Sequence, residues 1–302
     1  MNPAYLKTRF GVRICGLLVA AAGCFYTPAW ASIDLFEIDS VRSALGLEAS
    51  TSGVPWDEQS AGSLRATFHG WLAIDNGDNT VQFIAGSSLI ADETEAWQPG
   101  VRGSATTSPA SYGGVNVVGT GLNSVRNLTA TRSLAFDISG APLPMTETGF
   151  DVSGLVFTIP NSDNASLDHR SSGLLVTAAR RALGGLTATN APAEGHFSFA
   201  AEVQTLSVPV DITFKVQTTS PGDTTLHFTG TVVGHRGLSL RRPVLLMVRG
   251  SKDPGEVTLV WGDTYNLETS ETLNPPAWVP YEGPGPLVLT NSAAQGYFRL
   301  GF

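Results

Sequence analysis

Five histidines are the side chains best suited to metal binding or acid–base catalysis in this chain of 302 residues. Clustered imidazoles would indicate a catalytic or metal centre, but no two histidines here have the i, i+2 or i, i+4 spacing of a ligand pair. We expect His196 and His227 on the solvated faces of nearby strands, where they could be cross-strand neighbours. The sequence thus predicts that these two histidines are solvated and that the chain has no metal-ligating residue. The five are His69, His169, His196, His227 and His235.

Carboxylates are the second candidate group, since paired Asp or Glu residues hydrolyse glycosides and clustered oxygens bind calcium. Asp92, Glu93 and Glu95 form a short acidic run, which is more typical of a solvated loop than of a catalytic pair. Residues 75–79 and 161–164 are rich in oxygen ligands, yet neither fits the spaced calcium loop with its distal Glu. Turn chemistry explains both stretches.

Nucleophilic hydrolysis would need a serine at a strained turn with a base beside it, and the chain has no Gly-x-Ser-x-Gly motif. Asn127 and Asn164 begin formal N-glycosylation triplets, and a couple of such triplets are expected by chance in a chain rich in Thr and Ser. Tryptophans could form a carbohydrate platform, but we expect them as core or rim residues. They are Trp56, Trp71, Trp97, Trp261 and Trp278. The sequence therefore predicts a non-enzymatic protein with no catalytic residue, no cofactor and no metal.

The elements that would position these side chains are strands, because the hydrophobic period is two rather than 3.6. In residues 206–216 apolar and polar side chains alternate, which is typical of a strand with one solvated face. Residues 225–233 repeat the pattern after a turn at 218–223, and a third expected strand, residues 196–203, precedes residues 206–216. We expect these three strands to form an antiparallel meander. Pro209 has no N–H to donate and is expected at a sheet edge or a bulge.

The amino-terminal half follows the same pattern. Residues 65–74 and 80–85 flank an Asn-Gly step within 75–79, which predicts a hairpin. Apolar residues recurring over 176–183 predict one short helix, and the Gly, Ser, Thr and Pro content of residues 98–114 predicts a surface loop. Further expected strands are 44–49, 115–119, 128–138, 150–159, 167–176 and 186–189.

The first 31 residues have the pattern of a secretory signal peptide, with three basic residues, no acidic residue and an apolar run over 14–25. Small residues before Ser32 favour cleavage after Ala31, and lipoprotein processing at Cys24 is the alternative. Both cysteines, Cys15 and Cys24, lie in this segment, so the mature chain has none. Cysteine-ligated zinc and thiol chemistry are therefore excluded from the mature chain.

Removing this segment changes the formal net charge from -8 to -11, since it takes away three positive charges and no negative one. Such a surface would repel a phosphate backbone, so nucleic acid is not an expected partner. No apolar run of transmembrane length follows Ser32, so we expect a soluble or peripherally held exported protein, in the periplasm, outside the cell or on its outer surface.

The predicted fold class is all-β, with a β-sandwich or flattened, lipocalin-like barrel followed by a small C-terminal β module. The expected organisation is a signal peptide at 1–31, a main β domain at 32–240, a linker at 241–255 and the module at 256–302. Strands of the module are expected at 257–261, 264–269, 278–281, 287–290 and 297–300.

A resemblance to known proteins is carried by the stretches 59–64, 69–72, 81–91, 97–100, 111–114, 126–128, 136–138, 167–174, 206–210 and 223–226. Through them, residues 40–236 resemble uncharacterised exported proteins of planctomycete and verrucomicrobial bacteria, a resemblance that implies no enzymatic role. Residues 257–302, with Trp261, Trp278 and a closing Tyr-Phe-Arg-Leu, are similar to half of a fibronectin type III sandwich. Such modules serve contact or assembly.

We therefore expect a structural or adhesion component of the envelope or extracellular space, with envelope or matrix components as partners. A carrier of a lipophilic small molecule is the first alternative, because the order of strands and turns is also similar to periplasmic lipocalin-like barrels. A secreted hydrolase is the second alternative. An enclosed apolar cavity would favour the carrier, and a filled core would oppose it.

Overall fold

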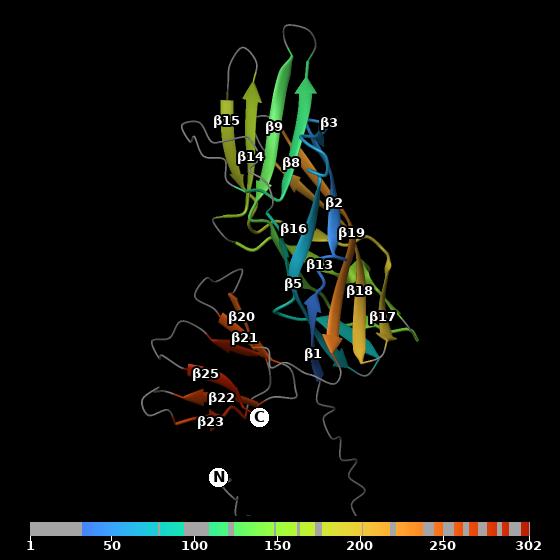
Figure 1. Ribbon diagram of the computed structural model, residues 1–302, viewed down its shortest axis with the longest axis vertical. Helices are drawn as coiled ribbons and strands as arrows, with labels where there is room; N and C mark the ends of the chain where they lie inside the picture. Colours follow the sequence, from blue (N-terminus) through green and yellow to red (C-terminus); the bar gives the residue numbers. More distant parts are fainter. Residues whose placement is uncertain are drawn as a thin grey trace, which may run out of the picture. The chain divides into compact units, whose positions relative to one another are not determined.

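The computed structural model describes most of the chain after the expected leader (Figure 1). The described residues are 32–77, 79–93, 109–119, 124–147, 149–161, 164–172, 177–200, 202–217, 222–237, 245–249, 257–261, 266–270, 277–282, 286–289 and 297–301. They form an all-β structure with four sheets and, as its only helical segment within these ranges, the 3-10 turn η2 at Val152–Gly154. The predicted all-β class is confirmed, while the predicted signal peptide lies outside the described residues.

Fourteen strands form the largest sheet, whose main path runs β12-β17-β18-β19-β1-β5-β7-β10-β13-β16. The strands are β1 (Ser32–Ile38), β2 (Ala44–Thr51), β3 (Val54–Pro55), β5 (Arg65–Gly77), β6 (Thr80–Phe83), β7 (Ser88–Ala91), β10 (Ala135–Ser139), β11 (Leu143–Pro144), β12 (Gly149–Asp151), β13 (Val156–Thr158), β16 (Thr187–Thr189), β17 (Glu194–Ala200), β18 (Val203–Val216) and β19 (Thr224–Gly237). Just after β16, the Ala191 N–H donates to the Asp211 carbonyl of β18 at 2.9 Å. The sheet therefore bends back toward its own strand β18.

Strands β17, β18 and β19 form the expected antiparallel meander, and β18 and β19 pair along their full length (Figure 1). On its other side, β18 pairs with β17 only as far as Ser207. Beyond that point Asn190 takes the place of a strand: its Nδ2 donates to the Pro209 carbonyl at 3.1 Å, and its Oδ1 accepts from Asp211 N at 2.8 Å. Pro209 lies where β18 is locally an edge, which confirms its expected position.

The core of the large sheet is packed with aromatic rings. The Phe136 ring lies between those of four other phenylalanines that belong to different strands, with centroid distances of 5.3 to 6.3 Å. The four are Phe68, Phe157, Phe214 and Phe228. All five side chains are buried, so aromatic packing fills the centre between these strands.

A second sheet has the order β15-β14-β9-β8-β4. Its strands are β4 (Asp57–Glu58), β8 (Tyr112–Val118), β9 (Val125–Arg132), β14 (Ser166–Ser172) and β15 (Thr177–Ala182). Tyr112 joins it to the large sheet, since its ring lies 5.5 Å from that of Phe228 and its hydroxyl donates to the Leu45 carbonyl at 3.1 Å. Burial raises the pKa of the Tyr112 phenol, which stays protonated.

The single strand expected at 128–138 is divided between the two sheets. Strand β9 ends at Arg132 and β10 begins at Ala135, in the large sheet. Between them Ser133 has a φ of 48°, a left-handed conformation that redirects the chain. An alternating apolar pattern cannot reveal such a turn, because the pattern resumes in the same phase.

The helix expected over 176–183 is wrong, because residues 177–182 form β15, which pairs with β14 from Ser166 to Ser171. The alanines and arginines favour a helix locally, but the ladder to β14 outweighs that preference. The surface loop expected at 98–114 is wrong at its end, since Tyr112 to Gly114 are buried in β8. Residues 98–108 lie outside the described ranges.

The hairpin expected around residues 75–79 is confirmed, but its turn lies two residues later than the Asn-Gly step. Gly77 pairs with Thr80, and Asn79 has a positive φ of 62°. Asn tolerates this left-handed conformation better than other non-glycine residues, so the asparagine that follows Asp78 supplies the turn.

Two further sheets lie in the C-terminal part, with orders β20-β21-β24 and β23-β22-β25. The strands are β20 (Leu245–Arg249), β21 (Val257–Trp261), β22 (Asn266–Ser270), β23 (Val279–Pro280), β24 (Leu287–Leu289) and β25 (Tyr297–Gly301). Strands β21 to β25 match the five strands expected there. Strand β20 lies within the expected linker at 241–255 and pairs with β21, so that stretch is part of a sheet. Across the described ranges no helix is long and apolar enough to span a membrane.

Candidate functional site

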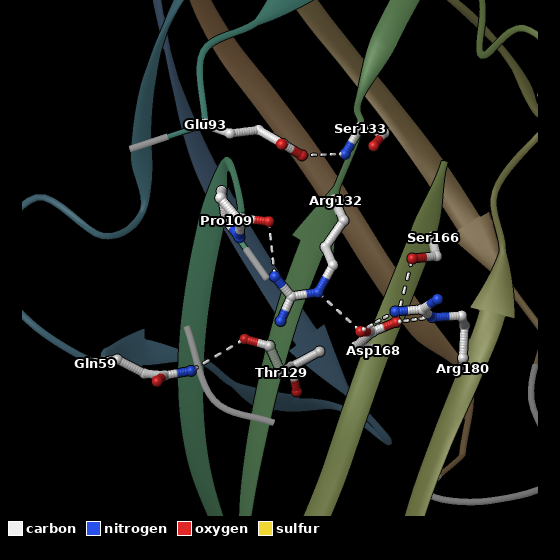
Figure 2. Close-up of polar contacts among 9 residues, drawn as sticks. All are labelled: Gln59, Glu93, Pro109, Thr129, Arg132, Ser133, Ser166, Asp168 and Arg180. Atoms are coloured by element: carbon white, nitrogen blue, oxygen red, sulfur yellow. Dashed lines mark hydrogen bonds and ion pairs between the residues drawn. The ribbon is translucent and has the colours of Figure 1, made fainter. Parts of the chain in front are cut away.

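Two buried charged side chains mark the second sheet as the candidate site. Arg132 on β9 and Asp168 on β14 have side-chain exposures of 6% and 2%. Arg132 Nε donates to Asp168 Oδ2 at 2.8 Å, and Arg180 on β15 donates to both carboxylate oxygens at 2.8 and 2.9 Å (Figure 2). We call these three residues the arginine–aspartate cluster. The strands place them together because Asp168 lies directly opposite Arg180 and diagonally across from Arg132.

The carboxylate of Asp168 is ionised and its acceptors are occupied. Burial raises its pKa, but the hydrogen bonds and charges of Arg180 and Arg132 outweigh burial and hold the pKa below its ordinary value. The Ser166 hydroxyl adds a fourth donor at 3.1 Å from Oδ1. The bond to Asp168 also raises the pKa of Arg180. A carboxylate held by four donors is a poor general base, so the cluster is built for structure or recognition rather than proton transfer.

The cluster also fixes the neighbouring segments. Arg132 Nη1 donates to the Pro109 carbonyl at 2.7 Å, and the next residue, Ser133, donates its N–H to Glu93 Oε1 at 2.5 Å (Figure 2). Glu93 was expected in a solvated acidic run; it is exposed, and it also bonds to the turn between β9 and β10. The turn from one sheet to the other is therefore held by ionic side chains on both sides.

The opposite face of the same sheet carries a chain of buried polar side chains. Asn116 on β8 accepts from Asn127 Nδ2 on β9 at 2.8 Å, Asn127 Oδ1 accepts from the Ser171 hydroxyl at 2.8 Å, and Ser171 contacts His169 Nε2 at 2.7 Å. Since the Ser171 proton goes to Asn127, His169 Nε2 must donate, which leaves Nδ1 as a buried acceptor without a hydrogen-bond partner. Burial lowers the pKa of His169 to about 4.

The other four histidines each lie near a carboxylate, at four separate places. The contacts are His69 with Asp92 at 2.8 Å, His196 with Glu194 at 4.0 Å, His227 with Asp211 at 2.8 Å and His235 with Asp39 at 3.0 Å. The expected proximity of His196 and His227 is wrong: along β18 they lie opposite Ser207 and Thr213, six residues apart. The alternating pattern predicts which face of the sheet each histidine lies on, but it does not predict the register of β17 and β19 relative to each other.

Thr205, His235 and Asp39 are the described residues most like a hydrolytic triad. His235 Nδ1 lies 2.9 Å from the Thr205 hydroxyl, and its Nε2 lies 3.0 Å from Asp39 Oδ2. Burial opposes ionisation of Asp39, but hydrogen bonds from His235 and two backbone N–H groups lower its pKa. Thr205 lies inside a ladder with β17 and β19 on either side, so the backbone around it is paired with strands rather than arranged as an oxyanion hole.

The remaining candidates are dispersed. Trp56 and Trp261 are buried, Trp71 and Trp278 are half-buried, and Trp97 lies outside the described residues, as does Glu95. The Asn127 sequon is buried in the chain of polar side chains described above, whereas Asn164 is exposed. Within the described ranges, no group of three or more His, Asp or Glu side chains is arranged to hold a metal ion.

Comparisons with known proteins identify no relative: no family model, no curated protein and no solved structure matches this chain.

The arginine–aspartate cluster was not anticipated from the sequence. Its residues come from three strands, and one of them, Arg180, falls in the segment expected to be helical. The sequence feature that could have indicated the cluster is the presence of Asp168 and Arg170 two residues apart in one strand, followed by Arg180 in the next segment. Recognising it requires the antiparallel register of the two strands.

Proposed function

We propose that this chain is an exported, non-catalytic β scaffold that works as a structural or adhesion component of the cell envelope or extracellular space. The observation that carries the proposal is the aromatic packing around Phe136, which occupies the centre of the large sheet with side chains. A lipophilic ligand would need that volume, so the packing counts against the carrier alternative.

The polar residues support the same reading. Asp168 is saturated by two arginines and a serine, and His169 is neutral and bonded within its sheet. Catalysis needs an acid or base with access to a substrate and a pKa near the working pH. These buried groups stabilise a sheet that can present its surface to a partner.

The test is fractionation of a Gram-negative host that expresses the full chain with its own leader. We expect the protein in the periplasm or the medium with Ser32 as the first residue by intact-mass analysis. Retention in the cytoplasm with the leader uncleaved would overturn the proposal. An acylated Cys24 would show instead that the exported protein is held by a lipid anchor and does not begin at Ser32.

A fluorescent apolar probe such as 8-anilinonaphthalene-1-sulfonate tests the carrier alternative on the purified mature chain. We expect no enhancement above that given by a protein with a filled core. Saturable binding with one site per chain would instead establish the carrier.

A further inference from the structure

We infer that the outer face of strands β9, β14 and β15, the face that carries Asp168, binds an extended acidic polysaccharide with carboxylate or sulfate groups. This inference deepens the proposed scaffold function by naming its partner class, and it rests on that function for the polymer being an extracellular one.

The charge of these three strands is opposite to that of the chain. The full chain has a formal net charge of -8, whereas β9, β14 and β15 together contain five arginines and one aspartate. Four of the arginines share the face of Asp168, because side chains alternate between the two faces along a strand. Each of these arginines lies opposite Asp168, or an even number of residues away from Asp168 or from the residue opposite it. They are Arg126, Arg132, Arg170 and Arg180.

Three of these arginines form a diagonal row across the sheet. Arg126 on β9 pairs with Ser172, and Arg170 lies two residues earlier on β14. Asp168 lies two residues earlier again, and Arg180 on β15 is opposite it. Each step crosses one strand and two residues, a separation of about 7–8 Å between Cα atoms. The row therefore places one arginine per strand at a regular Cα interval.

Solvent reaches this row. Arg126 is exposed, the Arg180 side chain is 51% exposed, and Arg170 is half-buried. Arg180 binds Asp168 through Nε and Nη2, so its Nη1 remains for a second acceptor. Asp168 also fixes the position of Arg180, which reduces the side-chain entropy that Arg180 would lose on binding.

The side chains between the arginines favour a polysaccharide over other polyanions. Leu128 and Ala178 are half-buried, and Val117 is 55% exposed, so small and aliphatic side chains lie between the arginines. Guanidinium groups bind carboxylate and sulfate in a bidentate manner, and a regular row suits a polymer with a charge on each repeat. Single-stranded nucleic acid would require aromatic side chains for stacking, and the described residues of β8, β9, β14 and β15 place none on the face of the row.

The experiment compares the purified mature chain with sodium alginate, dextran sulfate, uncharged dextran and vesicles containing phosphatidylglycerol. We expect binding to one or both acidic polysaccharides by isothermal titration calorimetry, with none to uncharged dextran. Arg126→Gln with Arg170→Gln should weaken that binding about tenfold and reduce its dependence on salt concentration. Neither residue belongs to the buried pair of Arg132 and Asp168, so the double variant is expected to fold.

The matched control is Arg42→Gln with Lys215→Gln, which removes two exposed positive charges outside this sheet. It should retain the affinity of the unmodified chain within about twofold. Equal weakening by both double variants, absence of binding to both acidic polymers, or binding to vesicles alone would overturn the inference. These outcomes are independent of the fractionation experiment, so failure of this inference and failure of export can be distinguished.

Discussion

Arg132 and Asp168 lie on neighbouring strands without facing each other in register, yet their side chains form a buried ion pair with Nε and Oδ2 2.8 Å apart. Arg132 is opposite Ser166, so its side chain runs diagonally to reach the carboxylate. Burying two charges is costly, and the additional bonds from Arg180 and Ser166 offset that cost.

Asp168→Ala should destabilise the fold by about 3–5 kcal/mol, because it leaves the Arg132 guanidinium buried without its counter-charge. Urea denaturation followed by circular dichroism measures the effect. Asp57→Ala is the matched control, since Asp57 is exposed on β4 of the same sheet, and it should stay within about 0.5 kcal/mol. A loss below 1 kcal/mol for Asp168→Ala would show that the pair is not the anchor of this sheet.

His169 should make stability depend on pH between about 6.5 and 4. Its folded-state pKa is lowered to about 4, so the unfolded chain takes up a proton at higher pH than the folded chain. The contribution is fully present above pH 6.5 and is lost as pH falls toward 4, by a total of about 3 kcal/mol.

The measurement is the free energy of unfolding at intervals of pH for the unmodified chain and for His169→Gln. The substitution should flatten the profile in that interval. Equal slopes for the unmodified chain and His169→Gln would contradict a neutral, buried His169.

Phe136→Ala should cost about 3–5 kcal/mol, because it removes the ring that contacts four others and leaves a cavity among them. Phe199→Ala is the matched control: Phe199 is 67% exposed on β17, and we expect a change close to zero. Thermal unfolding of the two variants separates these outcomes, and similar melting temperatures would argue against a packed aromatic centre.

Asn190→Ala should cost about 1–3 kcal/mol, since it leaves the Asp211 N–H and the Pro209 carbonyl without their side-chain partner. Asn164→Ala, at an exposed turn position, should have little effect. Hydrogen exchange gives a local readout: the Asp211 amide should exchange faster in Asn190→Ala than in the unmodified chain, while amides of β19 away from Pro209 change less. Unchanged protection of Asp211 would mean that Asn190 does not replace a strand there.

The sequence was sufficient for the strands whose alternation is long and regular. Strands β18 and β19 extend over fourteen residues each, and their alternating apolar side chains reveal both the strands and their pairing. The five C-terminal strands expected from shorter runs are likewise present. In β18, and over most of β19, one face is buried and the other is not, which is the condition for a clear period of two.

Other features depend on contacts that a linear pattern does not contain. Residues 177–182 have good local helix formers, and only pairing with β14 makes them a strand. Ser133 divides one continuous pattern between two sheets. The arginine–aspartate cluster requires the register of β9, β14 and β15, and the five histidines were separated in sequence with no indication that His169 alone would be buried.

The contact between Asn190 and Pro209 also affects how this protein behaves among other copies of itself. Beyond Ser207, where pairing with β17 ends, one side of β18 has no partner strand among the described residues, and such a side is a template on which another chain could add, which leads to aggregation. At Pro209 the open side offers no N–H, and Asn190 already occupies the neighbouring carbonyl and amide. The open stretch of β18 is thus protected against intermolecular strand addition at these two residues.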